Sequence, residues 1–278
     1  MNKLNFAAGI TLYNPTDEDI SNIKGLSSSF DKIFIFDNSD QVSNIKRFVF
    51  GEKFEIISEG ENKGLPYAFN KIIERCFDYD FLCTLDQDSV FDDTDIYAIT
   101  NCIEKSEDIN KIGVISPYID YGYEPFHKIE SVEEVEWTIT SGSFVNLSVL
   151  RKERLQYDNN YFIDRMEVDM CKQLISLGYK ILVYHGAVLH QTLGEDSGHR
   201  HPNHRVLRNY YMFRNRFYFN NKWYGGIKKQ FLNFSQTLRH IYLILMYEKE
   251  KINKIAIMKE AYCDYKNREM GKKNERKD

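Results

Sequence analysis

Short apolar runs alternate with amphipathic segments along the first 116 residues. The apolar runs predict buried strands at Asn5–Leu12, Lys32–Phe36, Phe54–Ile57, Phe81–Leu85 and Ile112–Ser116. Between them, apolar residues recur at three- and four-residue spacing, which predicts helices over Asp17–Leu26 and Pro66–Phe77 and from residue 93 to about residue 105. Strands that alternate with helices are typical of a parallel sheet covered on both faces. The pattern therefore predicts an α/β fold built on a mostly parallel sheet.

The pattern is less regular after residue 117. Residues 118–136 are polar and predict a loop or a hairpin, and a strand with a small-residue turn is expected within Thr138–Leu147. A helix is expected over Phe162–Leu177, ended by Gly178. Further strands are expected at Lys180–Val183 and Ala187–Leu189. We therefore predict one domain over residues 1–204, with halves of about 1–116 and 117–204, and a helical extension over residues 205–278.

The charge is divided unevenly along the chain. The whole sequence holds 37 Lys and Arg against 41 Asp and Glu, but from Arg205 onward the numbers are 18 and 7. Such asymmetry indicates an anionic partner for the basic segment.

The cysteines and the N-terminus indicate the compartment. The five cysteines form no CxxC pair, which favours reduced thiols in a cytoplasmic protein over a disulfide framework or a zinc site. The N-terminal residues turn polar too early for a signal peptide, and no apolar run is long enough to span a membrane. We expect a cytoplasmic protein that is not itself embedded in a membrane.

Two aspartates directly follow the apolar run that ends at Leu85. On an extended backbone Asp86 and Asp88 would point the same way. Two neighbouring carboxylates repel unless a cation lies between them, and Mg²⁺ or Mn²⁺ takes oxygen ligands together with substrate phosphates. From the spacing alone, a strand that runs into an acidic turn is the alternative. No glycine-rich phosphate loop is present, so a nucleotide would need such a metal.

Polar, turn-prone residues follow the early predicted strands. They appear in the order Tyr13-Asn14-Pro15, Asp37-Asn38-Ser39, NKGLPYAFN at residues 62–70 and LDQDS at residues 85–89. Ligands bind at the carboxyl ends of the strands in open α/β sheets, so these residues would form one polar rim. The ordered set resembles the nucleotide-sugar domain of the family two inverting glycosyltransferases, which have the GT-A fold.

The resemblance covers about the first four fifths of the chain. Ser141, Gly142 and Ser143 resemble the acceptor-side loop of that family, and residues 162–171 (FIDRMEVDMC) resemble a segment of its rhamnosyltransferase and galactofuranosyltransferase branches. His190 resembles the late metal-binding histidine of the branch. Residues 210–215, which contain Tyr-Tyr and Arg-Asn, resemble the YYxxRN element that follows the catalytic domain.

The family implies roles residue by residue. Nucleotide-sugar binding is implied for Thr11, Tyr13, Asn14, Pro15, Asp37, Asn38, Asn62, Lys63, Gly64, Asp86 and Gln87. Asp37 would hydrogen-bond the pyrimidine base, and Asp86 would lie against the ribose and the metal. A bound Mn²⁺ or Mg²⁺ would be held by Asp88, His190 and Asp86. His185, His199, His201 and His204 are alternatives to His190.

The same resemblance implies a general base. Glu167 falls where the family keeps its base, which is more often Asp, and Asp169 is the competitor. Inverting transfer needs one carboxylate to take the proton of the acceptor hydroxyl, and a cation to neutralise the departing diphosphate. Lys172-Gln173 departs from the Leu-Arg pair of the family. Residues 194–201 would form either a loop that closes over the donor or an ordinary solvent loop.

The predicted function is metal-dependent, inverting transfer of L-rhamnose from dTDP-rhamnose to a hydroxyl of a surface polysaccharide or lipid-linked glycan. Transfer from UDP-galactofuranose or a UDP-hexose, and a carbohydrate- or nucleotide-binding module without turnover, are the alternatives. A sugar-nucleotide nucleotidyltransferase would need a glycine-rich basic loop near the N-terminus, which is absent.

The C-terminal segment predicts a second surface. Residues 224–259 carry apolar residues at three- to four-residue spacing with Lys and Arg between them. Such a helix can lie on the inner face of the cytoplasmic membrane and contact anionic headgroups. The alternatives are packing on the rest of the chain and a homodimer interface. Nucleic acid is not expected as a partner.

Overall fold

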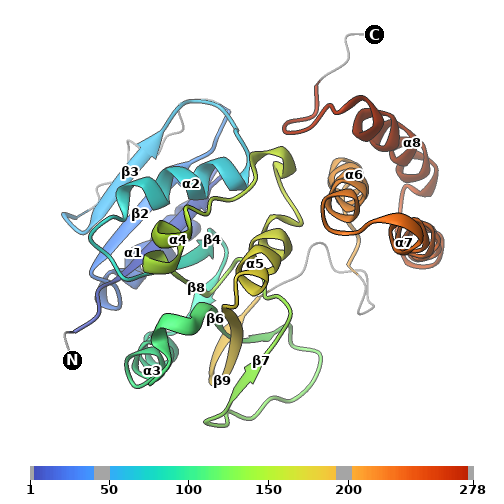
Figure 1. The fold of residues 1–278 in the computed structure, drawn as a ribbon. Coiled ribbons are helices and arrows are strands. Elements are labelled where there is room, and N and C mark those ends of the chain that lie inside the picture. Colours follow the sequence, from blue (N-terminus) through green and yellow to red (C-terminus); the bar gives the residue numbers. More distant parts are fainter. Residues whose placement is uncertain (1–2, 41–50, 192–201, 275–278) are drawn as a thin grey trace. The chain divides into compact units, whose positions relative to one another are not determined.

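A computed structural model describes residues 3–40, 51–191 and 202–274. The chain divides into two compact units, which are coloured along the sequence in Figure 1. We call residues 1–158 together with 167–191 the sheet unit, and residues 159–166 together with 192–278 the helical unit. The predicted domain limits at residues 116 and 204 stay predictions.

The sheet unit contains a mixed sheet of nine strands in the order β3-β2-β1-β4-β8-β6-β9-β5, with β7 beside β9. The strands are β1 (Phe6–Leu12), β2 (Lys32–Asp37), β3 (Phe54–Ser58), β4 (Phe81–Asp86), β5 (Val90–Phe91), β6 (Ile112–Asp120), β7 (Val132–Glu134), β8 (Ser143–Asn146) and β9 (Lys180–His190). The first four in the sheet order are parallel, and β6 is parallel to β9. β8 is antiparallel to both β4 and β6, so it joins the two parallel parts.

Helices cover the sheet. They are α1 (Asp17–Gly25), α2 (Leu65–Arg75), α3 (Asp93–Glu104), α4 (Leu147–Glu153) and α5 (Met166–Ser176), with short 3₁₀ turns at Leu26–Ser28 and Ile109–Lys111. α2 packs on β1 and β2, α3 on β6 and β9, and α4 on β4. The start of α1 is fixed locally, because the Thr16 hydroxyl accepts from the Asp19 amide and Asp19 accepts from the Thr16 amide.

The core of the sheet unit is apolar. All seven residues of β1 are buried, as are the apolar residues of β2 and β4. The ring of Phe144 lies 6.1, 6.3 and 6.4 Å from the rings of Phe6, Phe30 and Phe91, measured between centroids. Strands buried on both faces read as continuous apolar runs, which is why the sequence located them.

Two sequence predictions need correction. The helix predicted over Phe162–Leu177 begins only at Met166, because Phe162, Asp164 and Arg165 have φ values of 62°, 60° and 74°. These left-handed values end any helical path before Met166. The two strands predicted within residues 180–189 are one strand, β9, which pairs with β6 through a register shift at Pro117 and Tyr118.

The helical unit consists of α6 (Val206–Trp223), α7 (Gly226–Tyr247) and α8 (Lys251–Asn267), together with a 3₁₀ turn at Asn159–Tyr161. α6 packs against both α7 and α8. Its apolar core is small and mostly aromatic, comprising Phe162, Tyr210, Tyr211, Phe213, Phe217, Ile244, Met258 and Ala261. Over the described ranges, no helix has the length and apolar character needed to cross a membrane.

Candidate functional site

The strand register brings three of the predicted site residues to one edge of the sheet. Thr11 pairs with Asp86 across β1 and β4, and Leu12 pairs with Asp37 across β1 and β2. Because these strands are parallel, their carboxyl ends meet at this edge. Asp37 is fully buried, and one of its carboxylate oxygens accepts from the Ser39 amide at 3.2 Å. Thr11, Asp37 and Asp86 therefore lie side by side at three neighbouring strand ends.

The turn after β1 connects this edge to two other motifs. The Tyr13 amide donates to the Gln87 side chain at 2.8 Å, and the Tyr13 hydroxyl donates to Asp40 at 3.0 Å. Asn14 has a φ of 48°, and its amide donates to the Ser39 hydroxyl at 2.9 Å. The turn that ends at Pro15 is thus held against the residues that follow β2 and β4.

The backbone amides of Lys63 and Gly64 fix the loop at residues 62–64 by donating hydrogen bonds to asparagine side chains. The Lys63 amide donates to the Asn38 side chain at 2.8 Å, and the Gly64 amide donates to the Asn62 side chain at 3.0 Å. Gly64 has a φ of 85°, which favours glycine directly before α2. The Lys63 ammonium lies 2.7 Å from Glu61 and 3.2 Å from Glu59, and hydrogen bonds to these two carboxylates raise its pKa.

The small-residue turn Ser141-Gly142-Ser143 packs against the end of β4. The Ser141 hydroxyl accepts from the Asp86 amide at 3.3 Å and is hydrogen-bonded to the Ser89 hydroxyl. Gly142 has a φ of +78°, and a Cβ there would come within 2.9 Å of the Leu189 side chain. The turn thus packs against and supports the acidic motif. The acceptor-side role predicted for Ser141, Gly142 and Ser143 stays a prediction.

Strand pairing also brings His190 next to the acidic motif. Val90 pairs with His190 in the β5–β9 ladder, and Val90 is two residues beyond Asp88. The His190 side chain is 66% exposed, with Nδ1 3.2 Å from Asp120. His185, by contrast, is hydrogen-bonded to Glu133 at 3.0 Å. His199 and His201 lie outside the described residues, as does the loop predicted at 194–201.

The predicted metal ligands Asp86, Asp88 and His190 differ in their surroundings. Asp88 is exposed, and Asp86 accepts from the Gln191 side chain at 3.5 Å. Within the described part of the chain, no three His, Cys, Asp or Glu side chains are close enough together to hold a metal ion. The carboxylates of Asp86 and Asp88 are oxygen ligands of the kind that Mn²⁺ or Mg²⁺ takes, but the structure does not gather them with His190 into a three-residue site, so the metal stays a prediction.

The two candidate bases differ in exposure. Asp169 is fully buried in α5 and accepts from the Gln173 side chain at 2.9 Å. Glu167 lies in the first turn of α5 and is half-buried. A base must reach the proton of a bound hydroxyl, which a half-buried carboxylate can do and a fully buried, occupied one cannot without rearrangement.

Sequence reasoning singled out the Arg214-Asn215 pair without giving it a role. In the helical unit, the Asn215 side-chain amide donates to the carbonyls of Tyr161, Ile163 and Asp164 at 2.8, 2.6 and 3.2 Å. The Arg214 guanidinium donates to the Asn160 carbonyl at 3.4 Å. Both side chains are fully buried. The pair fixes the left-handed segment that directly precedes Glu167 in the chain.

Comparison with protein families and solved structures gives consistent results. A family model described as Glycosyl transferase family 2 matches residues 21–166. No curated protein matches the chain. A crystal structure of S. aureus TarS 1-349 in complex with UDP-GlcNAc has a TM-score of 0.59 at 12% identity, covering 94% of this chain and 80% of that one. The same protein in complex with UDP has a TM-score of 0.53 at 11% identity, covering 95% and 72%. At these identities the similarity shows the fold, and the predicted GT-A architecture is confirmed.

Proposed function

Since the chain belongs to glycosyl transferase family 2 and is an inverting glycosyltransferase, we propose that its donor is a pyrimidine nucleoside diphosphate sugar bound at the edge formed by β1, β2 and β4. The observation that carries this proposal is the strand register that aligns Thr11, Asp37 and Asp86. Asp37 would accept from the pyrimidine base, with the Tyr13–Pro15 turn and residues 62–64 around the nucleoside.

The donor sugar proposed is L-rhamnose carried by dTDP. The FID segment at residues 162–164 supports it through its resemblance to the rhamnosyltransferase branch. A UDP-linked sugar is the second candidate, favoured by the TarS structures, whose titles record UDP and UDP-GlcNAc. Thymine and uracil present the same hydrogen-bonding groups to Asp37, so this contact would not distinguish dTDP from UDP.

Chemistry at the edge would require Asp88, Asp86 and His190 to hold Mn²⁺ or Mg²⁺, which would neutralise the charge of the departing diphosphate. Glu167 would take the proton of the acceptor hydroxyl as the oxygen attacks the anomeric carbon. The bond from the anomeric carbon to the diphosphate oxygen breaks in the same displacement, so the configuration inverts. The acceptor proposed is a glycan, free or lipid-linked.

A ligand screen tests the donor proposal. A ligand that binds the folded state raises the unfolding temperature, so dTDP-rhamnose, UDP-GlcNAc, UDP-galactofuranose and ADP-glucose are compared with and without Mn²⁺. A Mn²⁺-dependent rise with dTDP-rhamnose alone supports the rhamnosyl donor, and a rise with a UDP-sugar alone supports the second candidate. Equal responses to ADP-glucose and the pyrimidine donors would contradict the proposed site.

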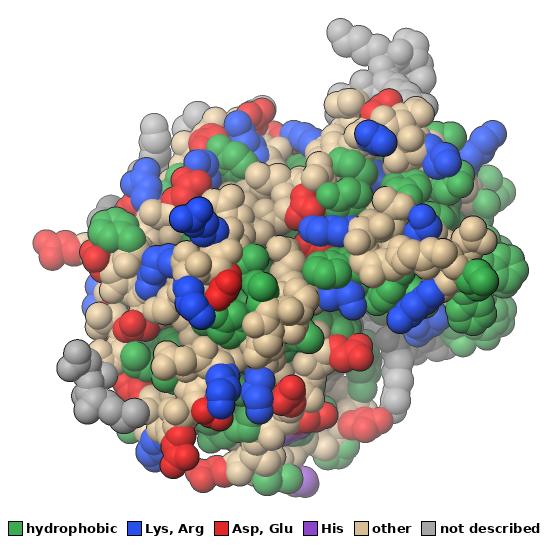
Figure 2. Space-filling view, viewed as in Figure 1, with side chains coloured by type: hydrophobic (Ala, Val, Ile, Leu, Met, Phe, Trp, Pro, Cys, Tyr) green, Lys and Arg blue, Asp and Glu red, His purple; other side chains and the backbone are tan. Residues whose placement is uncertain are grey.

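We also propose that α7 attaches the enzyme to an anionic membrane surface. Its apolar stripe is exposed, with Ile227 86%, Phe231 66% and Phe234 65% accessible. Figure 2 shows apolar side chains gathered over α7 and α8 beside basic ones. Lys228 and Lys251 are exposed and can contact headgroups. Lys254, expected from the sequence to do the same, is instead fully buried 2.7 Å from Glu248.

A further inference from the structure

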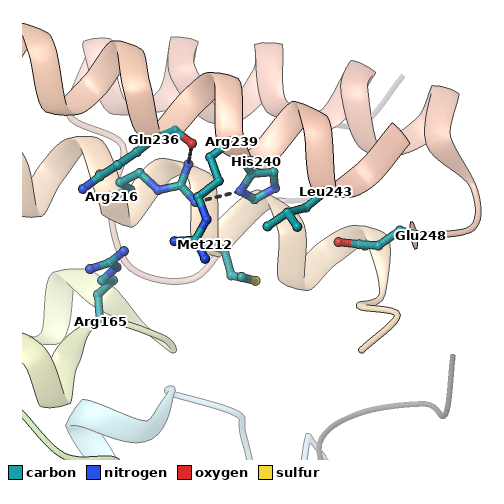
Figure 3. A pocket seen from close by; sticks show the side chains of 8 residues that line it. All are labelled: Arg165, Met212, Arg216, Gln236, Arg239, His240, Leu243 and Glu248. Carbon is teal, nitrogen blue, oxygen red and sulfur yellow. Dashed lines mark hydrogen bonds between the residues drawn. The ribbon is translucent and has the colours of Figure 1, made fainter. Parts of the chain in front are cut away.

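The helical unit contains a pocket lined by three arginines. The pocket has a volume of about 300 Å³ and lies between α7, α6 and the segment before α5 (Figure 3). Its polar lining residues are Arg165, Arg216, Gln236, Arg239, His240 and Glu248. Figure 3 shows the guanidinium groups of Arg216 and Arg239 near each other, with Arg165 facing them from the opposite wall. None of these residues belongs to the candidate site described above.

The three arginines of this pocket form no ion pair in the described part of the chain. No carboxylate described there lies within ion-pair distance of Arg165, Arg216 or Arg239. Glu248 is the acidic residue of the lining, but it accepts from Lys254 at 2.7 Å and from Asn209 at 3.2 Å. Lys254 therefore matches the charge of Glu248, and no other carboxylate among the described residues compensates the three arginines.

Arg216 is held in place by a buried hydrogen-bond network. Its guanidinium donates to the Gln236 carbonyl at 2.9 Å and to His240 Nδ1 at 2.7 Å. Because Nδ1 accepts, the His240 proton lies on Nε2, which donates to Asn209 at 2.8 Å. Arg216 is only 8% exposed. The network fixes the guanidinium before any ligand arrives, which lowers the entropy lost on binding.

A buried positive charge without a partner is costly for the folded protein. Burial, together with the charges of Arg165 and Arg239, lowers the pKa of Arg216 to about 9. An anion placed among the three guanidinium groups would offset this cost. Guanidinium groups donate in pairs to phosphate oxygens, and a pocket of about 300 Å³ has room for a phosphate or a diphosphate.

We propose that this pocket binds a phosphate or diphosphate group of the acceptor, so that the enzyme glycosylates a phosphate-bearing glycan. The proposal rests on the proposed function and adds the acceptor class to it. Arg165 belongs to the left-handed segment that Asn215 holds. In the chain it precedes Glu167, the proposed base, by two residues.

Titration of the full chain with inorganic pyrophosphate, in EDTA, tests the pocket directly. Arg239→Gln and Arg165→Gln should each weaken pyrophosphate binding about 10-fold or more, since each removes charge-assisted hydrogen bonds. Lys259→Gln, an exposed lysine of α8 outside the pocket, removes the same charge and should leave binding unchanged. Equal binding by the four proteins, or no binding by any, would overturn the pocket.

Competition identifies the carrier of the phosphate. Glucose 1-phosphate should displace pyrophosphate, whereas glucose should not. Displacement only by vesicles of phosphatidylcholine and phosphatidylglycerol would overturn the acceptor assignment in favour of a lipid headgroup. Donor hydrolysis by the unaltered chain, measured in parallel with Mn²⁺, separates the two proposals. Its absence would reject the proposed function, while hydrolysis with equal pyrophosphate binding in every variant would reject only the pocket.

Discussion

The two units differ in the size of their apolar cores and in the charged side chains that they bury. The sheet unit has a large apolar core around its strands, and it also buries the carboxylates Asp37, Asp95 and Asp169. The helical unit buries charged and polar side chains, among them Arg214, Asn215, Arg216, Asn209, His240, Glu248, Lys254 and Asp264, and it exposes the apolar stripe of α7. Apolar burial therefore accounts for more of the sheet unit than of the helical unit.

The difference indicates what each unit needs from its surroundings. An apolar core drives folding without a partner, so the sheet unit can present a polar edge to a ligand. A buried polar network stabilises only if each member is satisfied, and in return it specifies one geometry. The helical unit uses such a network to hold the segment before Glu167 and to orient Arg216. Its exposed apolar stripe, and the pocket arginines that no described carboxylate pairs with, are features of a recognition surface.

The largest expected effect concerns the edge of the sheet unit. Asp88→Ala should abolish sugar transfer, because the cation would lose an oxygen ligand at the departing diphosphate. EDTA should reversibly abolish transfer by the unaltered enzyme. Asp78→Ala, which removes an exposed aspartate of the same unit, serves as control. Product formation is measured by chromatography, and full activity in chelator would contradict the metal assignment.

The next effect separates the two carboxylates of α5. Glu167→Gln should lower kcat by roughly 10²–10⁴, the usual contribution of a general base, while donor binding is retained. Asp169→Asn should chiefly lower stability, because Asp169 is buried against Gln173. Single-turnover rates and calorimetric donor titrations measure both. If Asp169→Asn loses turnover and Glu167→Gln stays active, Asp169 is the base.

The polar network of the helical unit should be as important to stability as an apolar core. Asn215→Ala removes the side-chain donor that the carbonyls of Tyr161, Ile163 and Asp164 share, and it should lower the free energy of unfolding by about 1–3 kcal/mol. Transfer activity should fall as well, because the segment before Glu167 loses its anchor. Asn221→Ala, at an exposed position of the same helix, is the control. An unchanged denaturant midpoint would show that the network does not hold this segment.

The smallest effect concerns the exposed stripe. Replacing Phe231 and Phe234 together by Gln should weaken co-sedimentation with anionic vesicles about 10-fold without lowering stability, because both side chains are exposed. Phe77→Gln, at a phenylalanine of the sheet unit that is 69% exposed, should leave vesicle binding unchanged. If the stripe forms a dimer instead, light scattering will show a concentration-dependent mass that the double variant lacks.

The sequence by itself determined the features that depend on local pattern. Buried strands read as apolar runs, so β1, β2 and β4 were located to within about a residue. The polar rim followed from the order of the motifs, because parallel strands place their carboxyl ends at one edge. The α/β fold followed from the alternation of strands and helices, and the GT-A fold was implied by the resemblance of the ordered motifs to the family two glycosyltransferases.

Only the tertiary structure decided the features that depend on distant residues. α5 begins late because Asn215 binds the carbonyls of a segment about 50 residues earlier, which periodicity cannot reveal. The α7 stripe points outward because the opposite, polar face contacts the buried residues of α6, such as Asn209 and Arg216. The arginine pocket brings together residues 165, 216 and 239, which are far apart in the sequence. Only folding places their positive charges around one cavity. Local spacing fixes secondary structure, but long-range hydrogen bonds and burial fix which faces meet.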